Sequence, residues 1–164
     1  MKHLQASKRI SAILVTLLLL SLLAACGGET TSADVPVSDI ADAVCEAIGK
    51  TDSMSTAPDN YIQAYFKMDT DELGEYDVRI NTYGANIDEF GVFKAGTRSV
   101  SELTEAVDDY LALRLESWMD EYMPEEKPKL ESATVHTSGD YVIYCILSDA
   151  DRETAVSAFD ASLN

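Results

Sequence analysis

The sequence is poor in the residues that carry thiol, imidazole and cationic chemistry. Its 164 residues include only three cysteines and two histidines, too few soft ligands for a protein with several zinc sites. Basic residues are also scarce, because 12 Lys and Arg stand against 29 Asp and Glu, for a formal net charge of -17. A nucleic-acid binder needs a basic face that neutralises phosphates, so this class of function is excluded.

Short motifs of common enzyme classes are absent as well. The chain has no HExxH zinc motif, no phosphate-binding P-loop, no dinucleotide-binding glycine fingerprint and no G-x-S-x-G elbow. His136 is the one histidine beyond the N-terminal segment, and no spacing singles out a glycosidase pair among the acidic residues. We therefore assign no catalytic residue, metal or cofactor, and expect a protein that is not an enzyme.

The N-terminal segment has the pattern of an export signal. Lys2, Lys8 and Arg9 precede an apolar run over 10–25, which is shorter than the ~20 residues of a membrane-spanning helix. The run ends in LAACG, which resembles the bacterial lipobox at every position. This resemblance implies cleavage before Cys26 and attachment of a diacylglycerol to its thiol. The alternative is an ordinary signal peptide with a cysteine near its cleavage site.

These features predict a simple domain organisation. Residues 1–25 form the lipoprotein signal peptide, and residues 26–37, rich in small and polar side chains, form a flexible tether. Residues 38–164 are long enough for one domain, and an apolar fraction of 46% in the whole chain argues against disorder. Membrane lipid bound through Cys26 would hold this domain on the outer face of the cytoplasmic membrane.

Apolar periodicity and capping residues predict eight elements within the domain. Helices are expected over 38–50, 59–68, 99–122 and 148–163, and strands over 76–83, 88–95, 130–137 and 140–147. The helix over 99–122 opens with the capping box of Ser99 and Glu102, and Ser148 caps the last helix. Gly91 inside a strand indicates a bulge or a close backbone approach.

The order of the elements is α-α-β-β-α-β-β-α. Two hairpins and a long amphipathic helix predict an α+β fold, with an antiparallel sheet of about four strands and helices packed on one face. The segment YVIYCIL over 141–147 is apolar on both faces, so we expect it to be a central strand.

Several segments together resemble a known family. They are NIDEFGVFKA over 86–95, a helix with Arg114 in its middle and YMP at 122–124, the GDYV hairpin at 139–142, and SDAD at 148–151. In this order, and with the lipobox, they resemble DUF4358, a family of uncharacterised lipoproteins of Gram-positive bacteria. The resemblance covers about residues 38–163. It implies location and architecture, and carries no catalytic residue with it.

Arg114 is the most informative charged residue. Helical spacing places it on the same face as Val107, Leu111 and Trp118, where a guanidinium must be paired or reach water. One interpretation is a structural ion pair with Glu89 or Asp88. The other is an anion site in which Arg114 and Lys94 bind a carboxylate or phosphate.

Two further groups have alternatives that the sequence leaves open. Cys45 and Cys145 can form a disulfide in an exported protein, or remain two small buried thiols. The acidic stretch 69–77 has Asp and Gly at three EF-hand positions but Leu73 and Ile80 where oxygen ligands are needed. It fails as an EF-hand, and a solvated acidic loop is the simpler interpretation.

Three functions remain compatible with these observations. The leading hypothesis is a non-catalytic accessory or adaptor for another envelope protein, which predicts an exposed apolar patch. The second is a lipoprotein that binds a small ligand, which predicts a concave pocket near Arg114 and Lys94. The third is a cell-wall hydrolase, which predicts carboxylates of raised pKa in a cleft.

Overall fold

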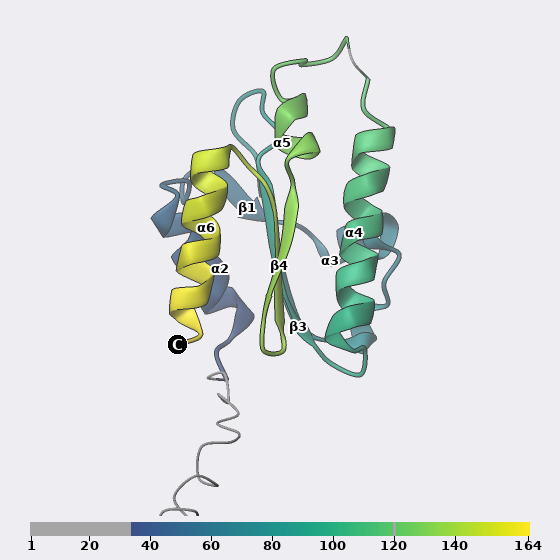
Figure 1. Ribbon diagram of the computed structural model, residues 1–164, viewed down its shortest axis with the longest axis vertical. Coiled ribbons are helices and arrows are strands. Elements are labelled where there is room, and N and C mark those ends of the chain that lie inside the picture. The colour runs from purple at the N-terminus through teal and green to yellow at the C-terminus, as the bar shows by residue number, and fades with distance from the viewer. Residues whose placement is uncertain (1–33, 120) are drawn as a thin grey trace, which may run out of the picture. The chain divides into compact units, whose positions relative to one another are not determined.

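The computed structural model describes residues 34–119 and 121–164, so the expected signal peptide, Cys26 and most of the tether lie outside the described residues. Figure 1 shows helices on either side of a central sheet. The helical elements are α2 (Val37–Ala47), α3 (Asp59–Tyr61), the π-helix η1 (Ile62–Phe66), the 3₁₀ turn η2 (Thr70–Glu72), α4 (Val100–Glu116), α5 (Lys127–Glu131) and α6 (Asp149–Ser162).

The sheet has five antiparallel strands in the order β1-β2-β3-β5-β4. They are β1 (Met54–Thr56), β2 (Leu73–Asn81), β3 (Glu89–Ala95), β4 (Thr134–Ser138) and β5 (Tyr141–Ile146). The α+β class and the antiparallel sheet are thus confirmed. The fifth strand is β1, which lies between the helices expected over 38–50 and 59–68 and was not predicted, because three residues are too few to show alternation.

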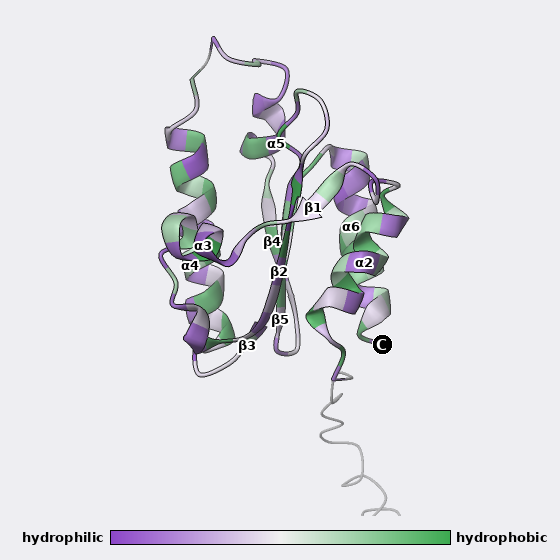
Figure 2. Ribbon diagram, turned by 180° about the vertical axis from the view of Figure 1, so that it is seen from behind, coloured by the Kyte–Doolittle hydropathy of each residue, from purple (hydrophilic) through white to green (hydrophobic). Residues whose placement is uncertain are grey.

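Helices cover both faces of the sheet, so the expectation that they pack on one face is wrong. α2 and α6 pack on one face in a core with Phe90, Val92 and Ile143. η1, α4 and α5 pack on the other face, in a second core with Phe93 and Tyr144. Figure 2 shows mixed hydrophobic and hydrophilic helices on both sides of the strands. The physical reason is β5, whose six residues are all buried and alternate between the two cores.

Local signals account for most element boundaries. The capping box of Ser99 and Glu102 is formed at the start of α4, and Ser148 caps α6. α2 instead begins at Val37, after Pro36 and one residue before the expected start, and has no side-chain cap. α5 occupies the beginning of the strand expected over 130–137, because Pro128 near its start suits a first helical turn.

Position 91, on the central strand β3, has no room for a side chain, which explains the glycine there. A Cβ on Gly91 would lie 2.4 Å from the Tyr144 ring and 2.9 Å from Val78. The register of β3 is continuous at this residue, so the glycine marks a close approach and not a bulge. In the described part of the chain, no helix is both long and apolar enough to cross a membrane.

Candidate functional site

A buried carboxylate surrounded by three tyrosines and an arginine lies between the sheet and α4. Glu89, at the start of β3, is only 3% exposed. Tyr110 and Arg114 are one turn apart on α4, Tyr61 ends α3, and Tyr144 lies on β5. We call these five residues the Glu89 cluster.

Both oxygens of Glu89 accept hydrogen bonds from the cluster. Oε1 accepts from the hydroxyls of Tyr110 (2.6 Å) and Tyr144 (2.5 Å). Oε2 accepts from Arg114 Nη1 (2.8 Å) and from the Tyr61 hydroxyl (3.1 Å). Arg114 Nη1 also contacts the hydroxyls of Tyr110 (2.6 Å) and Tyr61 (3.3 Å). Every buried polar group of the cluster therefore has a partner within it.

The environment keeps the three tyrosines neutral. Burial, together with the negative charge of Glu89, raises the pKa of Tyr61 to about 12. The same causes raise the pKa of Tyr110 and Tyr144 well above its usual value. Burial alone would lower the pKa of Arg114, but the charge of Glu89, its hydrogen bond to Arg114 and the neighbouring Tyr110 and Tyr61 together outweigh burial and raise that pKa. The tyrosines are thus donors to a carboxylate, and none is poised as a base at neutral pH.

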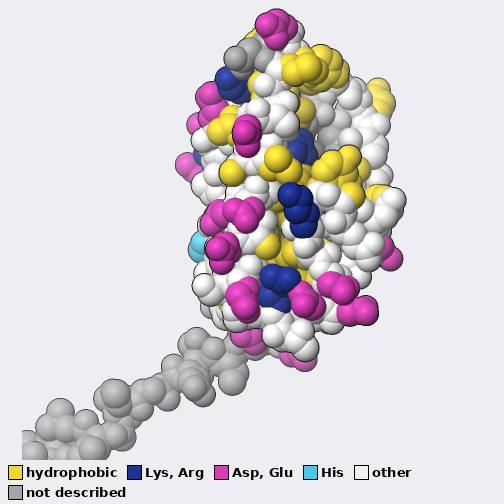
Figure 3. Space-filling view, turned by 90° about the vertical axis from the view of Figure 1, so that its right-hand side faces the viewer, with side chains coloured by type: hydrophobic (Ala, Val, Ile, Leu, Met, Phe, Trp, Pro, Cys, Tyr) yellow, Lys and Arg dark blue, Asp and Glu magenta, His cyan; other side chains and the backbone are white. Residues whose placement is uncertain are grey.

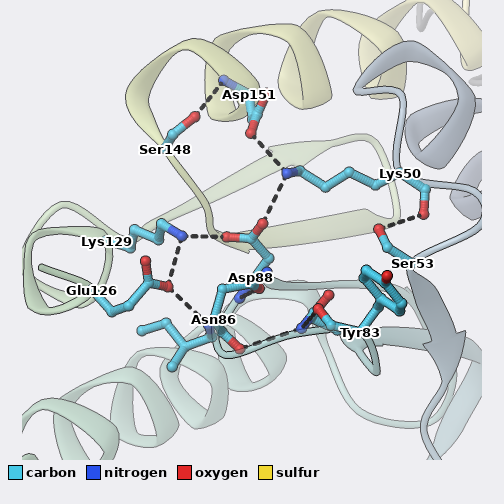
Figure 4. Close-up of polar contacts among 11 residues, drawn as sticks. Lys50, Ser53, Tyr83, Asn86, Asp88, Glu126, Lys129, Ser148 and Asp151 are labelled. Carbon is cyan, nitrogen blue, oxygen red and sulfur yellow. Dashed lines mark hydrogen bonds and ion pairs between the residues drawn. The ribbon is translucent and has the colours of Figure 1, made fainter. Parts of the chain in front are cut away.

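A second ionic network joins four segments next to the Glu89 cluster (Figure 4). Asp88, 5% exposed, accepts from Lys50 (2.8 Å) and Lys129 (2.7 Å). Lys50 also reaches Asp151 of α6 (3.3 Å), and Lys129 reaches Glu126 (2.7 Å). Burial alone would raise the pKa of Asp88, but hydrogen bonds from the two lysines outweigh it and hold that pKa below its usual range. The network ties both helical layers to the loop that precedes β3.

A small cavity of about 220 Å³ lies beside both groups. Its lining includes Tyr61, Asn81, Asn86 and Arg114. This volume is below the roughly 300–1,000 Å³ of ordinary small-molecule sites. The Glu89 cluster and the Asp88 network are therefore suited to hold helices against the sheet, with the cavity as a shallow opening at their edge.

The two cations that sequence analysis grouped into one anion site lie on opposite faces of β3. Arg114 pairs with Glu89 on the α4 side. Lys94 extends on the side of α2 and α6, where it bonds to Asp34 and lies 5.4 Å from the centre of the Tyr141 ring. The sheet separates the two, so they do not form a shared site. Of the two carboxylates considered for Arg114, Glu89 is the one that pairs with it.

Cys45 of α2 and Cys145 of β5 are buried in the same core as free thiols. Burial raises the pKa of both thiols, that of Cys145 to about 12. Cys26 lies outside the described residues. Among residues 34–119 and 121–164, no three His, Cys, Asp or Glu side chains are grouped to hold a metal ion. The acidic stretch at 69–77 forms η2 and the start of β2.

Exposed apolar side chains are concentrated around α4. Five of the six large apolar side chains that are exposed in the described residues lie on η1, on α4 or just beyond α4. We call these five the α4 face: Tyr65, Leu113, Leu115, Met119 and Tyr122. Tyr65 and Leu113 line a common groove, whereas Leu115, two residues after Leu113, lies on the other flank of the helix. Figure 3 shows apolar side chains along this side of the molecule with Lys and Arg side chains between them, and acidic side chains mostly towards one edge and the two ends.

A groove of about 450 Å³ runs between η1 and α4 within this surface. Its walls include Tyr65, Phe66, Tyr110 and Leu113, and Asp109 lies at its rim. η1 is a π-helix, which ends at Lys67 in the left-handed conformation (φ 54°). Such π-helical turns occur often at functional sites. The groove can therefore receive an apolar side chain or a short helical ridge from another molecule.

Sequence analysis missed the Glu89 cluster and the α4 face for different reasons. Tyr110 and Arg114 are spaced i, i+4, which signals a shared helix face, but nothing in the sequence shows that Tyr144 and Tyr61 reach the same carboxylate. The helix expected to run to Tyr122 ends at Glu116. Met119 and Tyr122 therefore lie beyond the helix, where they are exposed.

Comparisons with known proteins give one match. No curated protein matches the chain, and no solved structure does. A family model described as a domain of unknown function, DUF4358, matches residues 46–147, which run from α2 through β5. This match includes all five strands of the sheet, the Glu89 cluster and the α4 face, and it covers more than half of the chain. The chain therefore belongs to the DUF4358 family.

Proposed function

We propose that this chain is a lipid-anchored, extracytoplasmic lipoprotein that serves as a non-catalytic accessory protein by docking its α4 face on another envelope protein. The lipobox at Cys26 and the preceding signal pattern support the location. Two or three acyl chains would hold the domain at the membrane and raise its local concentration near a membrane-bound partner.

The observation that carries the docking function is the α4 face. Its five side chains are between 37% and 66% exposed on η1, on α4 and just beyond it, and two of them, Tyr65 and Leu113, line one groove. The cations near Glu89 and Asp88 are engaged in ion pairs, and the cavity beside them is small. The adaptor hypothesis is therefore better supported than a receptor for a small ligand.

The charge around the α4 face suggests the chemistry of the partner. Glu105, Asp108, Asp109 and Glu116 are exposed along α4 and outnumber the one exposed cation of the groove lining, Lys67, and the whole chain carries a formal charge of -17. A helix with an apolar ridge and basic flanks would fill the groove and meet these carboxylates. We therefore propose an amphipathic, basic helix of an envelope protein as the docking element.

Site-specific photocrosslinking in intact cells tests this proposal. A photoreactive residue at Leu113 or Met119 should yield one dominant crosslinked envelope protein. The same residue at Glu46, exposed on α2 in the opposite layer, should not yield it. Cys26→Ala with the signal otherwise intact should release the chain from the membrane and remove the crosslink.

A second variant separates docking from folding. Leu113→Asp places a charge in the groove and should abolish the crosslink from position 119 while leaving the circular dichroism spectrum unchanged. Thr154→Asp, on the exposed side of α6, is the matched control and should leave the crosslink intact. Equal crosslinking from Leu113 and Glu46, or no crosslink from the α4 face, would count against docking there.

A further inference from the structure

The strand β4 is an edge of the sheet that lacks the usual protection against pairing. It lies outermost in the order β1-β2-β3-β5-β4 and pairs with β5 without a register shift over Thr134–Ser138. Its sequence, TVHTS, contains no lysine, no acidic residue and no proline. Soluble proteins commonly place charges, prolines or bulges on such edges, or keep the strand very short. The opposite edge, β1, follows this rule with three residues.

The outer side of β4 is free to accept another strand. In the described part of the chain, the backbone of β4 makes hydrogen bonds only within the ladder with β5. Residues 134–138 are exposed or half-buried. The unpaired N–H and C=O groups along this side form a template for strand addition.

A groove lies beside the β4 edge of the sheet. It has a volume of about 540 Å³ and lies between β4 and α6, with Thr134, His136, Glu153 and Val156 among its lining residues. In a strand added to β4, alternate side chains would point to the α6 side, where this groove lies. The edge supplies backbone hydrogen bonds, and the groove supplies selectivity for side chains.

We propose that β4 and the adjacent groove form a binding site for an extended, basic peptide segment, which adds to the sheet as a sixth strand. Lysine or arginine at the alternate positions that point to the α6 side would lie in the groove, near exposed Glu153 and with their stems against Val156. β-branched residues at the intervening positions would point to the other face of the sheet. This site is separate from the α4 face, because α6 and α4 cover opposite faces of the sheet.

Charge favours a basic peptide over a second copy of this chain as the partner of β4. The groove's own cation, Arg152, is bound to Asp149 (2.8 Å) and to the Ser132 hydroxyl (3.0 Å), and His136 contacts Asp160 (2.9 Å). Glu153 is left exposed without an ion pair among the described residues. A second copy of the chain would bring another formal charge of -17 to the same edge. Like-charge repulsion disfavours that dimer, whereas a basic segment is attracted.

Hydrogen exchange of the full chain with defined peptides tests the site. The probe is a nonapeptide with Val and Thr at alternate positions and Lys between them. Two control peptides carry Glu in place of Lys, or N-methyl groups on two adjacent central residues, which block one amide on each peptide edge. The Lys peptide should slow exchange of the amides in 134–138, and both controls should fail.

A matched pair of variants tests the charge contribution. Glu153 is the fifth residue of α6, and Asp52 lies in the turn before β1 at the opposite edge of the sheet; both are exposed. Glu153→Lys should weaken binding of the Lys peptide about fivefold, the upper range of one exposed ion pair. Asp52→Lys, which makes the same change of net charge at the other edge, should leave the affinity within about twofold.

Three results would overturn the proposal. The first is no protection of 134–138 with the Lys peptide at ~1 mM, a concentration that detects weak binding. The second is equal protection by the N-methylated peptide, which would show that β4 does not pair with it. The third is concentration-dependent protection of 134–138 without peptide, which would assign the edge to a second copy of this chain. None of these results bears on the α4 face, whose crosslinks are tested separately.

Discussion

Replacing Arg114 with leucine removes the only cationic partner that Glu89 has among the described residues. The carboxylate would remain buried, with a side chain that is 4% exposed, and would keep three tyrosine hydroxyls as donors. Leucine replaces the stem of the arginine, so the loss is mainly electrostatic. Arg114→Leu therefore measures the contribution of the ion pair to the attachment of α4.

The expected loss of stability follows from the burial of Glu89. Removing one partner of a buried ion pair costs roughly 3–5 kcal/mol, because the other charge is left uncompensated. The three tyrosine donors and a guanidinium that is 25% exposed reduce this figure. We expect a loss of about 2–4 kcal/mol. For a domain of this size that lowers the melting temperature by roughly 8–16 °C.

Urea unfolding, followed by the fluorescence of the single tryptophan and by circular dichroism, measures this loss. Arg98→Leu is the matched control. Its side chain is also 25% exposed, but its partner Glu72 is 46% exposed, so we expect a loss of less than about 1 kcal/mol. In a cycle with Glu89→Gln, the double variant should recover about 1–3 kcal/mol relative to the sum of the single variants.

Two outcomes would refute this reasoning. If Arg114→Leu and Arg98→Leu destabilise the protein equally, the burial of Glu89 does not determine the cost. If the cycle with Glu89→Gln is additive, the two side chains do not interact energetically. In either case α4 would be held by its apolar contacts alone, with Leu103 and Val107 as the main buried residues.

Three further predictions follow from buried groups. Because the folded state keeps the tyrosines of the Glu89 cluster neutral, and the pKa of Tyr61 is about 12 against about 10 when unfolded, their contribution to stability should be fully present below pH ~10 and be lost as pH rises towards 12. Urea titrations at several pH values between ~8 and 12 test this, and a flat profile over that range would contradict it. Burial raises the pKa of Cys145 to about 12, so the Cys145 thiol of the native protein should resist alkylation by iodoacetamide at pH ~8. In urea without reductant, the thiols of both Cys45 and Cys145 should be alkylated. Thiols that stay unmodified in urea would indicate a disulfide. Gly91→Ala should cost about 1–3 kcal/mol by collision with the Tyr144 ring, measured by thermal unfolding, and an unchanged melting temperature would refute the close approach.

Local sequence signals predicted most of the elements because each depends on near neighbours. The capping box at Ser99 and the cap at Ser148 satisfy backbone groups within one helical turn. The hairpin at Gly139 needs a positive φ, which is 56° in the structure. The helix expected over 59–68 becomes α3 followed by the π-helix η1, because packing of Phe66 against Tyr110 and Phe93 is a tertiary contact.

The segment YVIYCIL carries a signal for three layers. It is apolar on both faces, and a strand of this kind must be covered on both sides. It therefore conflicts with a sheet that has helices on one face only. The structure places α2 and α6 on one side and α4 on the other. The composition of β5 alone thus predicts the three layers.

Sequence by itself determined the α+β class, the strong acidity and the membership in DUF4358, because these depend on local pattern, composition and order along the chain. It also carries the lipobox on which the proposed anchoring rests. Only the tertiary structure decided that Arg114 pairs with Glu89, that Lys94 lies on the opposite face of the sheet from Arg114, and that β4 is an open edge. Such contacts join residues far apart in the chain, and their geometry depends on how the whole sheet and its helices pack.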